Sequence, residues 1–521
     1  MQLKKELMNH SANAGGASLS GVIMDASTHA PLPAATIYLP DLKKGAIADD
    51  KGFFKIVSLP AGKHTIEISY QGYATDIETI EVNGDITLNF SLKPSYVERE
   101  GVTVTGVSSA ARTRQSPQPV AVIKRTDFIN TTATNTIDAL TKLVPGFNAV
   151  STGPAVSKPF IRGLGYNRVL TINDGVKQEG QQWGDEHGIE IDDYSVQRVE
   201  VLKGPASLMY GSDAIAGVIN IQSQLPAPEG TLKINALSEY QSNNNLRGFY
   251  GNIGGTKKGF SWNAYGSYKG AEDYQNKYDG YVFNSKFYNK NFGGMLGYNG
   301  SWGYSHLFIS NFDQHLGIVE GERDSVTGAF IKVLPGDETA ISTGDDFKKI
   351  NPEIPFQHIR HFKITSDNNY KIGSNNLDVV AGYQHNQRQE FGNADNPSVA
   401  NAWFNLQTMS YAVRWHFAYK NNWRTSAGIT GMYQTNENKA EEVIIPNYDL
   451  FEAGAFVFTR YSKDKLTISG GLRFDNRHVN GKQMKVDGEP KFNSFSKNFS
   501  NISGSAGFSY EFTKAFALKA N

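Results

Sequence analysis

From residue 227 to residue 521 the chain is a series of segments, each about ten residues or longer, in which apolar and polar side chains alternate. In the clearest segment Leu466, Ile468, Leu472 and Phe474 alternate with Thr467, Ser469, Arg473 and Asp475. Neighbouring side chains of a strand point to opposite faces, so this period of two predicts strands with one apolar and one polar face. About twelve such strands favour an antiparallel transmembrane β-barrel, because a soluble sandwich needs fewer and shorter strands.

The composition agrees with a barrel and excludes several other classes. No apolar run reaches 18 residues, which argues against a helical membrane protein, and 30 Phe with 25 Tyr can supply the aromatic girdles of a barrel. Lys plus Arg equal Asp plus Glu at 51 each, so there is no basic excess for nucleic acid. With no cysteine, disulfides, thiolate metal sites and cysteine nucleophiles are excluded.

The sequence at the two ends of the chain leads to an expectation about how much of the whole protein it contains. Residues 1–16, an N-terminus expected to be unstructured, contain no apolar stretch that could serve as a signal peptide. A barrel that did not close would leave sheet edges bare in lipid, and plugged transporter barrels use about 22 strands. We therefore expect residues 227–521 to be the first part of such a barrel, with about ten strands absent.

Residues 17–94 are short alternating strands separated by turns, and six or seven of them predict a small β-sandwich. The segment resembles the carboxypeptidase regulatory-like domain at Gly21-Val22-Ile23, Pro33-Ala34-Ala35-Thr36-Ile37, Asp50-Lys51-Gly52-Phe53-Phe54, Leu59-Pro60-Ala61-Gly62 and Tyr70-Gln71-Gly72-Tyr73. It contains no paired His and Glu that could bind a peptidase zinc ion. We interpret it as an accessory domain and expect no catalytic residues in the chain.

Residues 116–226 contain three motifs in a fixed order: PFIRGLG at 159–165, RVLTINDGV at 168–176, and VQRVEVLKGPASLMYGSDAIAGVINI at 196–221. Together they resemble the plug domain of TonB-dependent outer-membrane receptors, an α/β domain held inside the barrel. VLTIN and RVEVLK read as strands, and Thr136 to Leu143 reads as a short amphipathic helix that Pro145-Gly146 ends. The sequence LKGPASLMYG resembles the iron-complex and metal branch rather than the glycan importers.

Four plug charges, Arg162, Arg198, Glu200 and Lys203, lie on segments that the resemblance places inside the barrel. Charges enclosed there have to be paired. In the family such charges tie the plug to the barrel wall, so these four are predicted to form plug–barrel ion pairs. The alternative is an ordinary set of surface charges.

A linker, residues 95–115, precedes the plug and contains the β-prone island Val102-Thr103-Val104-Thr105. An exposed strand of this kind can pair with the sheet edge of another protein. It resembles the TonB box, which the inner-membrane energy coupler TonB grips. The alternative is an ordinary linker strand.

The plug's single histidine lies in the segment QQWGDEHGIEIDD at 181–193, beside Asp185, Glu186 and Glu190. Imidazole and carboxylates together suit zinc, copper, nickel or iron ions. His187, Asp185, Glu186 and Glu190 are therefore candidate ligands for a metal or metal complex, with His315, His358 or His361 of the barrel as additional ligands. His358 and His361 are three residues apart on a strand, so they should face opposite sides. Alternatively, the two acids bond plug amides and His187 is merely a polar loop residue.

The resemblance implies a transporter in the outer membrane, with its N-terminal domain in the periplasm. Its expected partners are TonB with the energising inner-membrane complex, outer-membrane lipid, and a small extracellular ligand such as a ferric siderophore, haem, zinc or copper. No cofactor is expected apart from a metal in the substrate. A signal-transducing receptor, an adhesin, and an importer of cobalamin or glycan are the alternatives.

Overall fold

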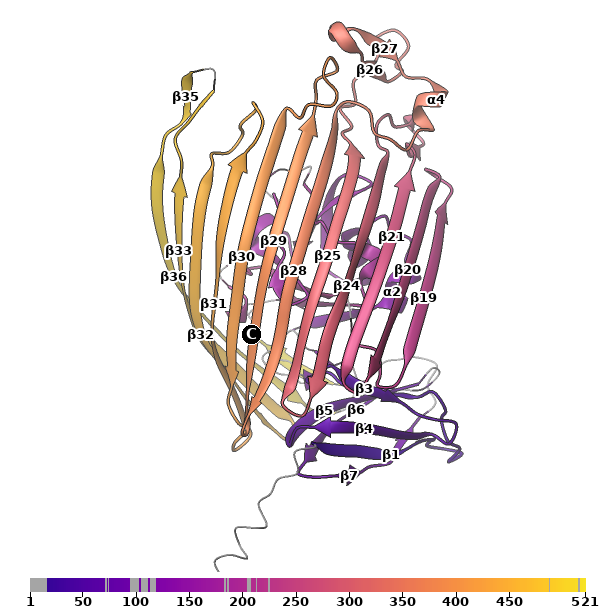
Figure 1. Cartoon of the computed structure of the whole chain (residues 1–521), viewed down its shortest axis with the longest axis vertical. Helices are drawn as coiled ribbons and strands as arrows, with labels where there is room; N and C mark the ends of the chain where they lie inside the picture. The colour runs from indigo at the N-terminus through magenta and orange to yellow at the C-terminus, as the bar shows by residue number, and fades with distance from the viewer. Residues whose placement is uncertain are drawn as a thin grey trace, which may run out of the picture.

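The computed structural model describes residues 16–70, 73, 75–93, 103–104, 111–112, 119–181, 184, 187–203, 208–211, 213–223, 225–486, 488–513 and 516–521. Strands dominate these residues, in the mostly β fold that the alternating pattern predicts. None of the helices in the described part of the chain has the length and apolarity needed to cross a bilayer. The chain forms three bodies, which are the N-terminal sandwich, the plug and one large sheet (Figure 1).

The N-terminal sandwich has two sheets whose inward-facing side chains form a common core. Its strands are β1 (Ala17–Asp25), β2 (Thr36–Leu39), β3 (Lys44–Ile47), β4 (Phe53–Leu59), β5 (Gly62–Ser69), β6 (Asp76–Val82), β7 (Ile86–Thr87) and β8 (Phe90–Leu92). One sheet has the order β4-β1-β7 with β8 also paired to β1, and the other has the order β3-β2-β5-β6. Leu19, Ile23, Ile37, Phe54 and Ile66 are fully buried between them. The sequence predicts six or seven strands. The structure has eight. The short strand β3 is not indicated by the sequence pattern, and one expected strand is divided into β7 and β8.

The plug contains two small sheets and two short helices. The first sheet has the order β11-β17-β18-β15-β16 and the second the order β12-β13-β14. The elements are β11 (Val120–Lys124), α2 (Arg125–Ile129), α3 (Thr136–Leu143), β12 (Phe147–Gly153), β13 (Val156–Ile161), β14 (Leu164–Gly165), β15 (Val169–Asn173), β16 (Val176–Lys177), η3 (Asp193–Ser195), β17 (Arg198–Lys203) and β18 (Gly217–Gln222). The predicted helix is confirmed as α3, which begins after Asn135, whose side chain accepts a bond from the Asp138 amide. Ile137 and Leu140 of α3 pack into the core of the first sheet.

The large sheet has thirteen antiparallel strands, one more than the alternation predicts, with β19 and β37 at its two edges. They are β19 (Leu232–Gln241), β20 (Leu246–Lys257), β21 (Phe260–Ala271), β24 (Phe287–Gly300), β25 (Gly303–Gly317), β28 (Phe356–Ile372), β29 (Asn375–Phe391), β30 (Ala402–His416), β31 (Trp423–Asn438), β32 (Tyr448–Lys463), β33 (Leu466–Gly481), β36 (Phe495–Glu511) and β37 (Ala517–Ala520). The sheet curves around the plug, as a barrel wall does (Figure 1). Its concave face is called the lumen face below.

Short turns join the strands at one end of the sheet, next to the sandwich, and long loops join them at the other (Figure 1). These are called the sandwich end and the loop end. The loops carry β22 (Gln275–Asn276), β23 (Gly280–Tyr281), β26 (Ile331–Val333), β27 (Thr339–Ile341), α4 (Gly344–Phe347), β34 (Met484–Val486) and β35 (Glu489–Phe492). At the sandwich end, Lys43 of the sandwich forms an ion pair with Asp367 of β28, and the Asn299 amide donates to the Lys43 carbonyl at 2.9 Å. The sandwich is therefore docked against the strand turns.

The two faces of the sheet differ as the alternating pattern predicts. Ile468, Leu472 and Phe474 of β33 are exposed on the outer face, whereas Arg473 and Asp475, which alternate with them, are buried. Neighbouring strands keep the same division, because cross-strand partners share a face. The polar face is directed toward the plug, which leaves an apolar outer face suited to lipid.

Candidate functional site

The candidate site is the plug segment of residues 177–191, called the plug loop, which runs from the end of β16 to just before η3. Its described residues lie against the lumen face of the sheet. The Gln384 side chain of β29 accepts from the Glu179 amide at 3.0 Å and donates to the Lys177 carbonyl at 2.8 Å. The Gln181 side chain donates to Asn436 of β31 at 2.8 Å. The barrel wall therefore holds the backbone and side chains of this loop at several points.

A polar circuit joins His187 and Glu190 of the plug loop to the wall. Arg388 Nη2 lies 2.9 Å from Glu190 Oε1, and Arg388 Nη1 donates to Gln357 Oε1 at 2.6 Å. Gln357 Nε2 in turn donates to Glu390 Oε1 at 3.2 Å, and the same oxygen lies 3.4 Å from His187 Nε2. The other imidazole nitrogen, Nδ1, bonds to the Gln181 carbonyl. Each of the two candidate ligands in the circuit thus faces a charged side chain of β29.

Burial makes this circuit energetically sensitive. Arg388 and His187 are fully buried and Glu190 is 3% exposed. Removing one member of a buried ion pair costs about 3–5 kcal/mol, because the remaining charge keeps its desolvation cost. Space is equally restricted, since a Cβ at Gly180 would lie 2.5 Å from the Glu190 carboxylate. A side chain at position 180 would therefore displace the Glu190 carboxylate from its place in the circuit.

A second network joins the plug to β32 and β33. Asp213 lies 2.9 Å from Lys177 and 2.6 Å from Arg477 of β33, and Arg477 also pairs with Glu452 at 2.5 Å. Burial raises the pKa of the Asp213 carboxyl, but Lys177 and Arg477 outweigh it and bring that pKa down to about 2. Asp213 therefore stays ionised at neutral pH and contributes a salt bridge across the plug–wall boundary.

Two further ion pairs cross the same boundary. Lys363 of β28 lies 3.2 Å from Asp174 in the turn after β15, and Lys269 of β21 lies 2.6 Å from Asp193 of η3. Next to the second pair, Ser267 donates to Asp192 at 2.8 Å. Burial, together with the neighbouring Asp193 carboxylate, raises the pKa of Asp192. Charges from four separate plug segments are thus matched by charges on the wall.

The four residues predicted to form plug–barrel ion pairs have a different setting. Arg198 Nε lies 3.1 Å from Glu200 Oε1 on the same strand, and Lys203 bonds to the Pro145 carbonyl. Arg162 is exposed, with a positive φ of 53°. These contacts lie within the plug, so the predicted ties are not among the plug–wall ion pairs described above. The side chain of Glu200 is fully buried, and Asn220 of the neighbouring strand β18 donates a bond to it at 3.3 Å.

The structure describes some of the remaining candidate residues and not others. Asp185 and Glu186 lie outside the described residues, as do Val102 and Thr105 of the predicted TonB box. Thr103–Val104 form β9, which pairs antiparallel with β10 (Ala111–Arg112). The metal role of the plug loop and the role of the box stay predictions.

The barrel histidines are not equivalent. As predicted, His358 and His361 face opposite sides of β28, with His361 buried on the lumen face. His361 and Glu190 line the same small cavity of about 20 Å³ between plug and wall. His315 pairs with His358 across β25 and β28, so both lie on the outer face. The expectation that His315 or His358 could add ligands in the lumen is therefore wrong, because the strand register directs both away from it.

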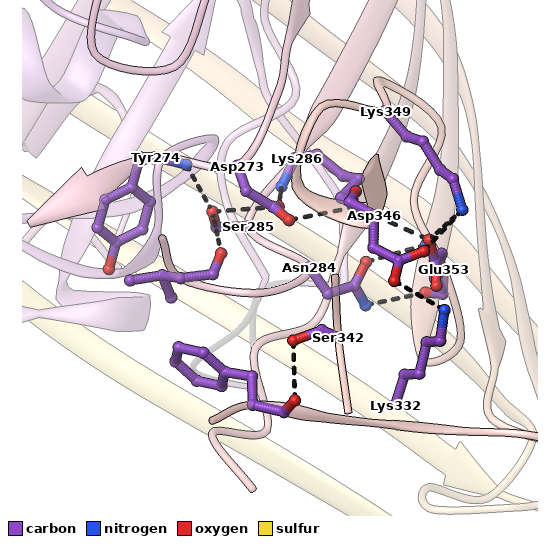
Figure 2. A network of polar contacts seen from close by, with 12 residues as sticks. Asp273, Tyr274, Asn284, Ser285, Lys286, Lys332, Ser342, Asp346, Lys349 and Glu353 are labelled. Atoms are coloured by element: carbon purple, nitrogen blue, oxygen red, sulfur yellow. Dashed lines mark hydrogen bonds and ion pairs between the residues drawn. The ribbon is translucent and has the colours of Figure 1, made fainter. Parts of the chain in front are cut away.

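At the loop end, a network of polar contacts joins two loops (Figure 2). Asp273 and Lys286 form a fully buried ion pair at 3.2 Å, and Lys286 Nζ donates to the Asp346 carbonyl at 2.6 Å. The Asp346 carboxylate also pairs with Lys332 at 2.7 Å and with Lys349 at 2.9 Å. Burial raises the pKa of Asp346, yet the lysine bonds hold it well below its usual value. The loops on either side of β24 and β25 therefore form one ordered rim.

The sequence does not single out the wall residues that contact the plug, which are Arg388, Glu390, Lys363 and Arg477. Each lies on the polar face of an alternating strand, which marks it as lumen-facing. Nothing in the spacing says which plug charge it meets. The arrangement holds the plug against the wall through ion pairs from several strands.

Family models match almost the whole chain. Residues 230–521 match the family described as TonB dependent receptor-like, beta-barrel, residues 112–218 match the TonB-dependent Receptor Plug Domain, and residues 19–104 match the CarboxypepD_reg-like domain. These matches confirm the resemblances drawn from the plug and sandwich motifs.

Similar proteins cover parts of the chain. An iron-regulated outer membrane virulence protein of Vibrio cholerae is 37% identical over 129 residues, which is 23% of this chain and 20% of that protein. The vitamin B12 transporter BtuB of Vibrio vulnificus is 40% identical over 102 residues, 19% of this chain and 16% of that one. The structure of the ferric yersiniabactin uptake receptor FyuA of Yersinia pestis has a TM-score of 0.55 at 17% identity, covering 77% of this chain and 64% of FyuA. The aligned part of this chain thus spans a fifth or less of these two curated relatives.

Proposed function

Because the chain belongs to the TonB-dependent receptor family of the outer membrane, we propose that it serves in TonB-dependent active import of a metal ion or metal complex. The observation that carries this proposal is the setting of the plug loop. His187 and Glu190 offer an imidazole and a carboxylate to zinc, copper or iron, and both lie opposite charged residues of β29 near the loop end. Ligand would enter from that end.

Ligand binding would loosen the plug by exchanging partners. A cation bound by His187 and Glu190 would take over the carboxylate that now pairs with Arg388, at 2.9 Å. The loop would then lose its two charged contacts with β29, because Glu390 contacts the imidazole that the cation would occupy. Both ligands are buried in the present arrangement, so the loop has to shift outward to receive the cation.

Energy for the movement would come from TonB. The coupler would pair with Val102 to Thr105 in the linker before the plug, as a strand adds to a sheet edge. The plug–wall contacts are ion pairs and hydrogen bonds to a large extent, which a pull can replace one at a time. A signal-transducing role is disfavoured because the N-terminal domain is a β-sandwich rather than a mixed α/β signalling domain.

A second candidate is import of a non-metal nutrient such as cobalamin. It is favoured by the similarity to a protein named as a vitamin B12 transporter, which at 40% identity over 102 residues is higher than that to the iron-regulated protein. Cobalamin import would use the same TonB-dependent release but would not need His187 as a ligand. The two candidates therefore differ in whether uptake requires the His187 side chain.

The test is growth of cells that depend on this receptor under separate limitation of iron, zinc, copper and cobalamin. Deleting residues 100–106 should abolish uptake of the substrate, whichever it is, and uninterrupted uptake would contradict a transporter. His187→Ala should lower uptake of one metal at least tenfold, on the scale of a lost metal contact. Its matched control is His385→Ala, an imidazole on β29 that bonds to Asn405.

Each outcome assigns the function differently. Loss of one metal in His187→Ala with normal uptake in His385→Ala supports metal import through the plug loop. Wild-type uptake of every metal in His187→Ala would contradict the metal site. Cobalamin-dependent growth that fails only on deletion of residues 100–106 would identify the second candidate.

A further inference from the structure

A cluster of two histidines and an aspartate lies on the outer face of the sheet, apart from the plug and the lumen. His315 of β25 is the cross-strand partner of His358 of β28, and Asp313 is two residues from His315 on the same face. Lys363 of β28 contacts the plug residue Asp174, so the lumen-facing positions of that strand are the odd-numbered ones. His358 is even-numbered and therefore points away from the lumen.

The three side chains converge on one point. Asp313 Oδ1 lies 3.2 Å from His358 Nε2 and 3.6 Å from His315 Nδ1. All three possible ligand atoms lie within 4.8 Å of one another. The two imidazole rings are stacked with centroids 3.8 Å apart, and Tyr288 of β24 stacks on the other side of His315 at 4.6 Å. The His315 ring is thus held between His358 and Tyr288.

From this geometry we propose that Asp313, His315 and His358 bind a divalent transition-metal ion, with Zn²⁺ as the best fit, on the outer wall of the barrel. In a tetrahedral zinc site with bonds of about 2.0–2.1 Å, neighbouring ligand atoms are about 3.3 Å apart. The 3.2 Å and 3.6 Å separations match that spacing. A water molecule would complete the coordination as the fourth ligand.

The hydrogen bonding of His315 supports a metal over an ordinary polar cluster. Its Nδ1 atom is buried and has no hydrogen-bond partner, although it points toward the Asp313 carboxylate. A buried polar atom left in this way is costly unless something else satisfies it. A metal ion between the three ligand atoms would do so. Among the residues that the structure describes, this is the one group of three ligand side chains close enough to hold an ion.

Two cations nearby set a limit on the affinity. Arg360 is the cross-strand partner of Asp313, and Lys290 lies 5.2 Å from the ring of Tyr288. Both repel a divalent ion, so the site should bind more weakly than one surrounded by carboxylates. The same repulsion favours zinc or copper, which bind imidazole strongly, over calcium or magnesium, which depend on oxygen ligands.

The position of the site indicates what the ion would do. β25 and β28 are neighbours in the sheet, but they are joined through the long loop of residues 318–355 at the loop end. An ion held by both strands would fasten the base of that loop from the outer face of the sheet. It would not lie on the route of an imported substrate, because the lumen is on the other face of the strands.

The test is zinc binding to the purified full chain in detergent, after treatment with a chelator and dialysis. His187→Ala serves as the background, so that the plug loop cannot contribute a histidine ligand. We expect one Zn²⁺ per chain by equilibrium dialysis. His358→Gln and Asp313→Asn should each lower the affinity at least tenfold, since even residues that only support metal ligands contribute about that much. Unchanged circular dichroism would show that both variants fold.

The controls make the result decisive. His385→Gln replaces another outer-face imidazole and should keep the full affinity. Co²⁺ in place of Zn²⁺ should give the visible absorption of a tetrahedral ion in the His187→Ala chain, and that absorption should disappear in His358→Gln. The proposal is overturned if the chain binds no Zn²⁺ or Co²⁺, or if binding persists unchanged in both His358→Gln and Asp313→Asn.

Discussion

The circuit around the plug loop and the cluster around Asp346 are both networks of charged side chains at the loop end, yet they are built in opposite ways. In the circuit, Arg388 and Glu190 form an ion pair at 2.9 Å with both side chains buried. In the cluster, the Asp346 carboxylate is shared by Lys332 and Lys349, and the Lys349 side chain is 51% exposed. The circuit joins two domains, whereas the cluster joins two loops of the same wall.

The two networks differ in what the loss of one charged partner would cost. Removing one member of a buried ion pair leaves the other charge without compensation, so the seated plug loop should be sensitive to a single substitution. A carboxylate with several partners, one of them in water, loses little when one lysine leaves. We therefore expect the rim to tolerate the loss of one lysine, and the contact between plug and wall to be weakened by the loss of one arginine.

Of the substitutions that test this contrast, Arg388→Met is expected to have the largest effect. It leaves Glu190 buried without its ion-pair partner, and the seated plug loop should lose about 3–5 kcal/mol. Amide hydrogen exchange of residues 187–191 should then become at least a hundredfold faster, because each 1.4 kcal/mol is a factor of about ten. The double variant Glu190→Gln with Arg388→Met should recover much of the protection. Equal exchange in the single variant and the unaltered chain would show that this pair does not hold the loop.

An intermediate effect is expected when the Asp213 network is titrated. The pKa of Asp213 is about 2 in the folded chain against 3.8 ordinarily, so its ion pairs contribute fully above pH 3.8 and are lost as the pH falls toward 2. A shift of that size corresponds to about 2 kcal/mol. Protection of the plug against protease should fall over this range in the unaltered chain. In Asp213→Asn it should start lower and change less, and parallel pH profiles would contradict the assignment.

The smallest effect, which sharpens the contrast, is expected for Lys349→Ala in the Asp346 cluster. The exposed lysine should contribute about 0–1 kcal/mol, because Lys332 continues to pair with the carboxylate. Hydrogen exchange of residues 339–353 should change by less than about fivefold on that scale. Asp346→Ala is the matched comparison and should open the loop much further, since it also removes the bond to the Thr343 amide. A large effect of Lys349→Ala would mean that losing one ion pair destabilises the rim as much as it destabilises the contact between plug and wall.

Much of the fold can be predicted from local sequence. The alternation in β33 gives both the strand and its two faces, because side-chain direction along a strand depends only on position. Thr136–Leu143 is a helix because its apolar residues share one face and Pro145 follows. His358 and His361 face opposite sides for the same reason, because they are three residues apart on one strand.

The candidate site is harder to predict, since its partners come from distant parts of the chain. His187 and Glu190 are recognisable as possible ligands, but Arg388 and Glu390 lie about two hundred residues later and meet them only through the packing of plug against wall. The predicted ties at Arg198 and Glu200 illustrate the same limit. A charge on a plug strand has to be paired, yet the sequence does not say whether its partner is a neighbour on that strand or a residue of the wall.

The sequence by itself determined the three domains' types, the strand periodicity of the wall and the chemical character of the plug loop, because each depends on residues close together in the chain. Tertiary structure alone decided which charges meet across the plug–wall boundary and that His315 and His358 lie together on the outer face. The register between β25 and β28 sets that meeting, and it is fixed by hydrogen bonds along both strands with a long loop between them. Such a register has no local signature.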